Sequence, residues 1–522
     1  MRGKRSGYVL ALDVGTSSAR ALLFDERARR VPGVEVHLPY QPHVAADGTS
    51  EIDADRLLRL AFRAIDRLYR LAGGRRASLA AVAMSCFWHG LLATDAAGQP
   101  LTPVFLWSDS RSWRVAEDLA DRLDGESLRQ RTGCLLHPTY WPAKLGWARL
   151  EQPRLRNQDV RWLSFPDLLY WRLFGRPVTS VSMASGTGLL NLEACTWDRA
   201  VLRDLELDAE ALPALSERMK GLVQPYARRW PALSAIPWFT AAGDGGLANL
   251  GSGCSGTEDR GLTVGTSGAL RVILRSPLER IPAGLWCYRL DRQRLVVGGA
   301  LNSGGNLYSW LKQNLKVDPR VLERSLRKLP PGGHGLTFLP LLAGERSPGF
   351  ASHARGAVAG LTLASTALDV ARAGLEAVAV QFAVVNGLID EMVRPARRLV
   401  ASGAGLLHSP GWMQMMADAI GVPVAASRAT EASSRGAAIY ALEKLELLDP
   451  LRLPPQVGRT YAPDARHWEA YRQERSRLET LYGFLVRRRV LDDQGPQAGF
   501  AQASGAEAAG RVSEPVAGRG EN

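Results

Sequence analysis

The strongest constraint on this chain is a short motif that occurs twice, about half a chain apart. Residues 13–19 read Asp-Val-Gly-Thr-Ser-Ser-Ala, and residues 263–269, which begin 250 positions later, read Thr-Val-Gly-Thr-Ser-Gly-Ala. Apolar runs precede and follow each copy, which is the pattern of a strand, a tight turn and a second strand. One such hairpin is ordinary, but two at this spacing indicate duplicated domains that face each other.

The two turns have the composition of a phosphate-binding loop. Small residues let the backbone approach a ligand closely, and successive N–H groups in a tight turn form a nest for an anion. Threonine and serine hydroxyls add further donors. Two such loops that converge from two domains predict a polyphosphate bound between them, although either loop taken alone is more often a plain hairpin turn.

A third element near the carboxyl end has the pattern of a nucleotide site. Residues 399–402 predict a strand, residues 403–405 read Gly-Ala-Gly, and a helix is expected over residues 410–420. Ser409 is a suitable N-cap and Gly421 a suitable stop for that helix. A strand, a glycine turn and a helix in this order are typical of nucleotide binding, and the spacing is not the GxGxxG pattern of dinucleotide sites.

The composition narrows the functional class. The chain has 522 residues, 46% of them hydrophobic, which favours two domains of roughly 200–250 residues. Its net charge of +13 comes mainly from arginines spread along the chain, so we interpret it as a solvated basic surface that attracts an anionic nucleotide, not as a nucleic-acid site. No apolar stretch has the length of a membrane span. The five cysteines form no CxxC pair, which favours reduced thiols in a cytoplasmic enzyme over disulfides or a metal site.

On these residues the chain resembles the FGGY carbohydrate kinases, a family that includes glycerol, xylulose and gluconate kinases. The resemblance runs from about Tyr8 to Leu445. It is carried by the two phosphate loops, by a segment similar to the one that holds the catalytic base, and by segments similar to the two family signatures: Asp13–Arg20, Gly265–Gly268, Gly243–Gly245, Lys144–Trp147 and Gly356–Leu361. The sequence departs from the family at Trp141 and Pro142, and at Ala404, where a second glycine is more usual.

The resemblance implies an α/β fold of two ribonuclease H-like domains, the arrangement of the actin-like ATPases, with the active site in the cleft between them. We expect an N-terminal domain over residues 6–253, which binds the sugar and holds the first phosphate loop and the catalytic aspartate. A C-terminal domain over residues 254–490 is expected to hold the second phosphate loop and the adenosine pocket. Residues 491–522 lack apolar periodicity and predict a disordered tail.

The resemblance also implies the catalytic groups. Asp244, between two glycines, is the expected base for the proton of the acceptor hydroxyl, whereas spacing alone would favour a surface turn. Asp13 ends the first strand beside the first loop, and a carboxylate there would repel a triphosphate unless it holds Mg²⁺, directly or through water. Gly245, next to the base, is expected to let the sugar approach the backbone.

Most of the remaining nucleotide contacts are expected from residues of the two loops. The hydroxyls of Thr16, Ser17 and Thr266 are expected to donate to the β- and γ-phosphates of ATP, and Gly265 gives the close backbone approach. Arg20 is expected either to reach a phosphate or to pair with a surface acid. The candidates for the adenosine pocket are Gly403, Ala404, Gly405 and Gly436.

The acceptor pocket is expected to contain Trp88, His89 and Trp107, because an indole face stacks on a sugar while polar groups bind its hydroxyls. Core packing is the alternative for Trp107. Asp109 and Arg111 are as compatible with a structural ion pair as with a pocket contact.

Together these residues predict an ATP-dependent carbohydrate kinase. Segments 132–138, 243–251 and 298–306 resemble gluconate kinases, whereas Trp88-His89-Gly90 is closer to xylulose kinases, so we favour gluconate and keep xylulose as the alternative. The expected partners are ATP, Mg²⁺ and a small sugar or sugar acid, with no nucleic acid and no membrane. A homodimer is left open.

Two other functional classes share part of this pattern. An actin- or Hsp70-like ATPase that switches shape shares the duplicated domain and both loops, but it needs no aromatic pocket around Trp88, and nothing after residue 450 is large enough for a client-binding domain. A degenerate kinase that only senses a sugar is disfavoured by the retained Asp13, Asp244 and Thr266.

Overall fold

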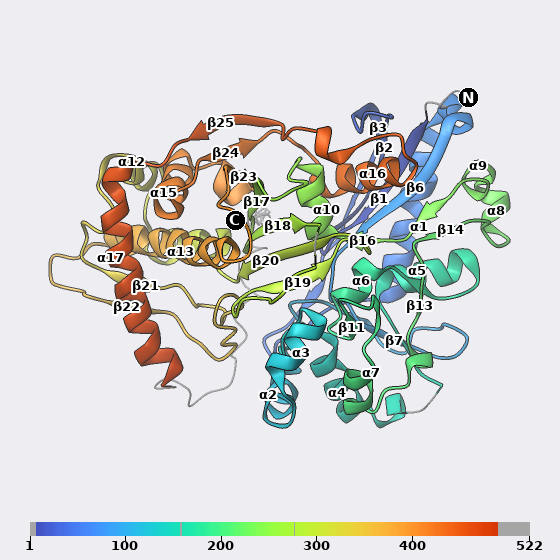
Figure 1. The fold of residues 1–522 in the computed structure, drawn as a ribbon, viewed down its shortest axis with the longest axis horizontal. Helices are drawn as coiled ribbons and strands as arrows, with labels where there is room; N and C mark the ends of the chain where they lie inside the picture. Colours follow the sequence, from blue (N-terminus) through green and yellow to red (C-terminus); the bar gives the residue numbers. More distant parts are fainter. Residues whose placement is uncertain (1–6, 157–158, 276, 489–522) are drawn as a thin grey trace, which may run out of the picture.

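The computed structural model describes residues 7–156, 159–275 and 277–488. Within them, two large mixed sheets lie next to each other, with helices packed on their faces (Figure 1). The tail predicted over residues 491–522 lies outside the described residues. In the part of the chain that is described, no helix has both the length and the apolar character needed to cross a membrane.

The N-terminal sheet is built around the first predicted hairpin. Its strands are β1 (Tyr8–Val14), β2 (Ser18–Phe24), β3 (Arg30–Pro39), β6 (Leu79–Cys86), β14 (Arg218–Met219), β15 (Trp238–Phe239) and β16 (Ala242–Gly243). They run in the order β14-β15-β6-β1-β2-β3, and β16 also pairs with β6. β1 is antiparallel to β2 and parallel to β6. Six of its seven residues are buried, as expected for a strand covered on both faces.

The C-terminal sheet repeats this arrangement around the second hairpin. Its strands are β17 (Asp259–Val264), β18 (Gly268–Leu274), β19 (Trp286–Arg289), β20 (Leu295–Leu301), β23 (Arg398–Ser402), β24 (Val424–Ser427) and β25 (Val457–Tyr461). Their order is β19-β20-β18-β17-β23-β24-β25. β17 is antiparallel to β18 and parallel to β23, just as β1 is to β2 and β6. The predicted fold, two α/β domains of the actin-like ATPase type, is confirmed.

Two helices fill the space between the sheets. α10 (Asp244–Gly251) and α16 (Ala432–Lys444) pack so closely that their facing glycines leave no room for a side chain. A Cβ on Gly436 would lie 1.9 Å from the Leu247 carbonyl oxygen, and one on Gly251 would lie 1.8 Å from that of Ala432. Close helix packing therefore accounts for both glycines.

α16 belongs to the predicted C-terminal domain by sequence but packs in the core of the N-terminal sheet. This helix packs on β1 and β6, and its buried residues belong to the same apolar core as the N-terminal sheet. Figure 1 shows it beside these strands, although it follows the C-terminal sheet in the sequence. The predicted boundary between residues 253 and 254 therefore does not separate the two cores, because the chain returns to the first core at α16.

Two helices of the C-terminal half begin with side-chain caps, and the one predicted over residues 410–420 has the predicted boundaries. α13 (Ala367–Asp390) begins with a capping box between Thr366 and Asp369. α15 (Pro410–Ile420) begins at the expected cap, where the Ser409 hydroxyl accepts a hydrogen bond from the Trp412 N–H at 3.1 Å. It ends at Gly421, which has a left-handed φ of +75°.

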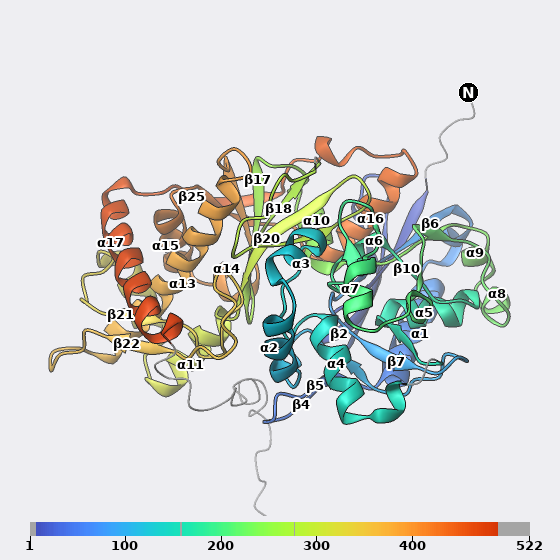
Figure 2. The ribbon, with the colours of Figure 1, turned by 60° about the horizontal axis from the view of Figure 1, so that its bottom comes forward.

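A smaller layer of the N-terminal half lies next to the C-terminal sheet (Figure 2). It contains α2 (Trp113–Arg122), α3 (Gly125–Thr132), α4 (Trp141–Glu151), β4 (His43–Val44), β5 (Ser50–Ile52) and β8 (Val104–Phe105). Arg129 of α3 donates to the carbonyl oxygen of Ile281 at 2.8 Å, and the Cys287 N–H of β19 donates to that of Gly133 at 2.9 Å. The two halves therefore touch on one side of the cleft.

Candidate active site

The two predicted phosphate loops face a common space. Thr16 from the first loop and Thr266 and Ser267 from the second line two adjoining cavities of about 330 and 290 Å³. We call the larger one, which also contains Asp244, the Asp244 cavity, and the smaller one, which also contains Trp113, the Trp113 cavity. Residues from two hairpins 250 positions apart in sequence thus meet across one opening.

The strands of the two hairpins pair in different registers, although the loop sequences are similar. In the first hairpin Val14 pairs with Ala19, whereas in the second Val264 pairs with Gly268, one residue earlier. Ser17 is exposed and is absent from the described lining of both cavities.

The second loop is held by the backbone of its neighbours. The N–H of Gly305 donates to the Gly265 carbonyl at 2.7 Å, and the N–H of Asn306 donates to the Thr266 carbonyl at 3.0 Å. Gly403, with a left-handed φ of +91°, lies so close that a Cβ would be 2.3 Å from the Val264 carbonyl oxygen. This contact brings the Gly403–Gly405 turn against the phosphate loop.

Gly436 does not share this location. Its closest neighbours are atoms of Leu247 on α10, so the structure gives it a role in helix packing and removes it from the candidates for the adenosine pocket. The close contact between α10 and α16 explains why the residues around Gly436 are small.

Asp244 is the first residue of α10 and lines the cavity next to the N-terminus of this helix. Burial raises the pKa of Asp244 to about 6; the Arg271 guanidinium opposes this shift and the charge of Asp13 adds to it. A carboxylate with such a pKa is ionised at neutral pH and still accepts a proton readily, as a general base must.

The glycines beside Asp244 lie close to bulky side chains. A Cβ on Gly243 would lie 1.8 Å from the Trp88 ring, and one on Gly245 would lie 3.0 Å from both the Trp88 ring and the Arg271 Nε. Trp88 covers Gly243, whereas Gly245 lines the Asp244 cavity, so the approach of a substrate to its backbone stays a prediction. Trp88 itself is 5% exposed and donates from Nε1 to the Ser182 carbonyl at 3.0 Å, so it forms a fixed wall.

Asp13 is buried at the end of β1, and burial raises its pKa. Its carboxylate accepts a hydrogen bond from the Ser434 hydroxyl at 3.2 Å. In the described residues no group of three or more His, Cys, Asp or Glu side chains could hold a metal alone. Two neighbouring carboxylates, Asp13 and Asp244, nevertheless fit Mg²⁺, which takes few protein ligands and completes its shell with phosphate oxygens and water.

The Arg20 side chain is held by an acid and by a residue of its own hairpin. Its Nη1 forms an ion pair with Glu431 at 2.7 Å, and its Nε donates to the Ser18 hydroxyl at 3.0 Å. The predicted phosphate contact is therefore replaced by the second alternative, pairing with an acid. That acid comes from the segment just before α16, so the pair ties the first hairpin to that segment.

Two histidines in the Asp244 cavity are neutral, because burial lowers the pKa of His89 and of His137 to about 3. His89 Nδ1 lies 2.5 Å from the Gly186 carbonyl oxygen, so this nitrogen donates and Nε2 is left to accept. His137 Nδ1 accepts from the Thr139 N–H at 3.2 Å, which leaves its Nε2 as a donor. Lys144 supports both segments by donating to the carbonyls of His89 at 3.1 Å and Thr139 at 2.8 Å. The pair can therefore bind hydroxyls in complementary ways.

Trp107 lines both cavities, but its ring already has a partner. The Arg346 guanidinium lies 4.8 Å from the centre of the ring, a cation–π contact. Arg346, Arg271 and the hydrogen-bonded pair Tyr140 and Tyr288 are cavity residues that the sequence did not identify. The strand pattern could have indicated Arg271. Alternate residues of a strand share a face, and Ala269, two residues before Arg271 in β18, lines the cavity.

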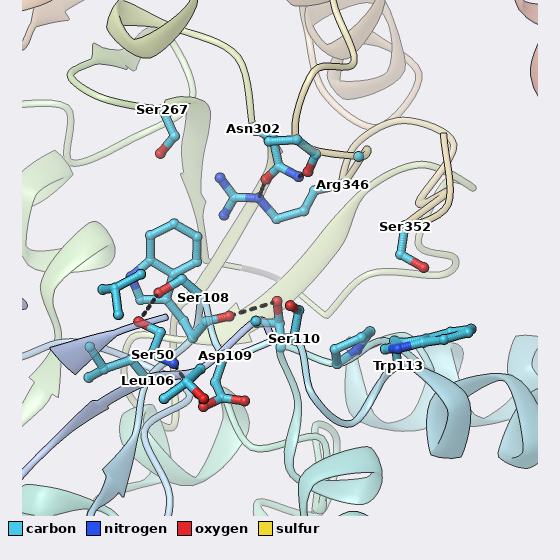
Figure 3. A pocket seen from close by; sticks show the side chains of 18 of the residues that line it. Ser50, Leu106, Ser108, Asp109, Ser110, Trp113, Ser267, Asn302, Arg346 and Ser352 are labelled. Carbon is cyan, nitrogen blue, oxygen red and sulfur yellow. Dashed lines mark hydrogen bonds between the residues drawn. The ribbon is translucent and has the colours of Figure 1, made fainter. Parts of the chain in front are cut away.

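Asp109 and Arg111 form a structural ion pair. Arg111 Nη2 lies 2.6 Å from Asp109 and 2.7 Å from Glu51, and the guanidinium stacks at 4.4 Å from the centre of the Trp147 ring. These contacts tie β5 to the loop after β8, and Asp109 of that loop lines the Trp113 cavity (Figure 3).

Comparisons with known proteins agree with this geometry. The N-terminal domain model of the FGGY family of carbohydrate kinases matches residues 8–251, and the C-terminal domain model matches residues 261–443. The gluconokinase of Bacillus subtilis (strain 168) is 29% identical over 512 residues, which cover 94% of this chain and 98% of that protein.

Solved structures give the same result for the fold. A ligand-bound xylulose kinase from Lactobacillus acidophilus superposes with a TM-score of 0.84 at 26% identity, over 92% of this chain and 98% of that one. A gluconate kinase from the same organism reaches 0.84 at 25% identity with the same coverage. The overall shape therefore does not distinguish between the two kinds of acceptor.

Proposed function

Because the chain belongs to the FGGY family of carbohydrate kinases, phosphotransferases with an alcohol group as acceptor, we propose that its acceptor is D-gluconate and its catalytic base Asp244. The observation that carries this proposal is that Asp244, Thr16 and Thr266 line one cavity. A hydroxyl bound there would lie between a base and the phosphates of ATP, which is the arrangement that in-line transfer needs.

We propose that the nucleotide lies along the two loops. The hydroxyls of Thr16 and Thr266 and the backbone at Gly265 would donate to the phosphates. Gly403, Ala404 and Gly405, which lie against the second loop, would leave room for the adenosine. Mg²⁺, held near Asp13, would neutralise part of the phosphate charge.

In the transfer step Asp244 accepts the proton of the acceptor hydroxyl. The hydroxyl oxygen forms a bond to the γ-phosphorus, and the bond between that phosphorus and the bridging oxygen of the β-phosphate breaks, which releases ADP. His89 and His137 would orient the other hydroxyls, one as an acceptor and one as a donor. Closure of the two halves would exclude water from the reaction.

Gluconate is favoured over xylulose by two observations. The Bacillus subtilis gluconokinase is similar to this chain over nearly the full length of both proteins, and the segment over residues 132–138, which resembles gluconate kinases, contributes His137 to the Asp244 cavity. Xylulose remains the alternative, because a xylulose kinase is equally close in fold.

Several features of the whole chain belong to the same proposal. A sugar-binding half over residues 6–253 and a nucleotide-binding half over residues 254–490, apart from α16, would close on the substrates. The five cysteines are free and buried, as we expect for a cytoplasmic enzyme. Neither nucleic acid nor a membrane is expected as a partner, and the residues leave open a homodimer.

The test is ADP release with Mg-ATP and each of D-gluconate, D-xylulose, L-ribulose and glycerol, with a reaction lacking any acceptor as the control. We expect D-gluconate to stimulate ADP release most strongly. Stimulation by D-xylulose instead would show that the protein is a kinase whose acceptor is D-xylulose and not D-gluconate. Equal ADP release with and without every acceptor would favour a switch ATPase and refute the proposal.

A further inference from the structure

Four of the six buried arginines in the described residues form an ion pair with a carboxylate, whereas Arg289 and Arg435 donate to backbone carbonyls. Arg294 lies 2.7 Å from Asp291 and 2.6 Å from Glu443. Arg260 lies 2.6 Å from Asp390. This is the usual rule, because a charge removed from water is costly unless it is paired.

Arg346, half-buried at the wall of the Asp244 cavity, also lacks a described carboxylate partner. Its Nε donates to the Asn302 side-chain oxygen at 2.7 Å and its Nη2 to the Leu301 carbonyl at 3.0 Å. No described carboxylate forms an ion pair with it, and burial lowers its pKa to about 10. Figure 3 shows the side chain reaching from the C-terminal half toward the space between the halves, with its bond to Asn302.

Arg271, half-buried in the same cavity, has fewer partners still. It has one long hydrogen bond, from Nη1 to the Thr263 hydroxyl at 3.4 Å, and forms no ion pair with a described carboxylate. Burial lowers the pKa of Arg271, and Asp244 partly offsets this shift. The charge of Arg271 in turn lowers the pKa of Arg346, so the two cations repel each other across the cavity.

The rest of the lining does not balance these charges. Among the described residues that line the Asp244 cavity, Asp244 is the one carboxylate. His89 and His137 are neutral, and Tyr140 and Tyr288 hydrogen bond to each other at 2.6 Å. The cavity therefore has an excess of positive charge and two guanidinium groups that a bound anion would complete.

We propose that Arg346 and Arg271 form the subsite that binds the carboxylate of a sugar-acid acceptor. This inference rests on the proposed kinase function and assigns the class of its acceptor to these two residues. A planar guanidinium matches a carboxylate with two parallel hydrogen bonds. A neutral sugar of the same size would leave both cations unpaired.

The γ-phosphate of ATP is the other anion that could reach these arginines, but the contacts of Arg346 favour the acceptor. Arg346 stacks on Trp107, whose carbonyl oxygen accepts from Thr139 at 3.1 Å in the segment that also holds His137. It therefore belongs to the wall that carries the hydroxyl-binding histidines. The phosphates have their own donors in the two loops.

The test compares D-gluconate with D-glucitol, which carries a CH₂OH group in place of the carboxylate. It measures kcat/KM for both acceptors, KM for ATP, and binding of D-gluconate without ATP by calorimetry. The variants are Arg346→Met and Arg271→Met. Arg131→Met is the matched control, since Arg131 is half-buried, paired with Asp198 at 3.1 Å and outside both cavities.

The wild-type protein is expected to prefer D-gluconate, and each variant should lower kcat/KM for D-gluconate about 10- to 10²-fold more than for D-glucitol. Calorimetric binding of D-gluconate should weaken in the same variants and stay unchanged in Arg131→Met. Thermal unfolding of each variant separates a misfolded protein from a lost contact. If Arg271→Met fails to fold, Arg346→Met alone decides.

Three results would overturn the inference. Equal losses for both acceptors together with a raised KM for ATP would assign the arginines to the γ-phosphate. Phosphoryl transfer to D-xylulose with no binding of D-gluconate would support the kinase function and refute the carboxylate subsite. If no acceptor is phosphorylated, the proposed function fails, and calorimetry still decides the subsite: no binding of D-gluconate refutes it, and binding that both variants weaken supports it.

Discussion

The two halves of this molecule share a fold and differ in the charges that they bring to the cleft. The residue before the last of strand β1 is Asp13, whereas the corresponding position of β17 is Thr263. Asp244 also comes from the N-terminal half. The C-terminal half brings two cations, Arg271 and Arg346, and no described carboxylate to the Asp244 cavity.

This difference shows how a duplicated scaffold can divide one reaction. The common hairpins place a phosphate loop on each side of the cleft, which both halves need. In the proposed reaction, the carboxylates for the proton and the metal would come from one side, and the cations that suit an anionic acceptor from the other. Variants on either side should therefore have distinct effects.

The largest effect is expected for the base. Asp244→Asn keeps the size of the side chain but cannot accept the proton, so kcat should fall by at least about 10²-fold. Binding of ATP, measured by calorimetry, should remain within about twofold, because the loops are untouched. Near-normal turnover would show that the N-terminal half does not supply the base.

The two loops can be compared directly with Thr16→Ala and Thr266→Ala. Hydrogen bonds to charged groups contribute about 1.5–3 kcal/mol, so each variant should lower kcat/KM for ATP about 10- to 10²-fold. Steady-state kinetics with ATP as the varied substrate measure both. A loss in one variant alone would mean that the two halves share the hairpin but not its role.

The pH dependence tests the contact between the halves. Because the pKa of Asp244 is raised to about 6, the base becomes protonated below that pH, and kcat/KM should fall about tenfold per pH unit there. Arg271 favours the ionised form, so its removal should raise this pKa further. The acid limb of Arg271→Met should therefore lie at higher pH than that of the wild type, and an unmoved limb would separate Arg271 from Asp244.

The smallest effect is expected for the exposed residue of the first loop. Ser17→Ala should change kcat/KM for ATP by no more than about twofold, as is usual for a surface side chain without a buried partner. The same kinetic assay measures it beside Thr16→Ala. A loss as large as that of Thr16→Ala would mean that ATP reshapes the first loop when it binds.

The sequence predicted the parts of the site that depend on local pattern. The repeated motif was enough to predict two sheets with a loop in each, because strand, turn and strand are set by neighbouring residues. The cap at Ser409 and the stop at Gly421 also depend on nearby atoms, and both are confirmed.

The remaining parts depend on contacts between distant segments, which a local pattern does not contain. Arg20 and Glu431 are 411 residues apart, so nothing near Arg20 indicated that it would form an ion pair there. Gly243 beside Asp244 is covered by Trp88, which comes from the turn after β6, and nothing near Gly243 in the sequence indicated that contact. Gly436 looked like part of an adenosine pocket and instead serves a helix contact.

The most direct test of the central claim is the fate of the γ-phosphate. The protein is incubated with Mg-ATP labelled with ³²P at the γ-position and with D-gluconate, and the labelled products are separated by charge. If the acceptor and the two loops meet in one cavity as described, the label appears in an acid-sugar phosphate and scarcely in inorganic phosphate. Label that appears in inorganic phosphate at the same rate with and without the acceptor would contradict the account.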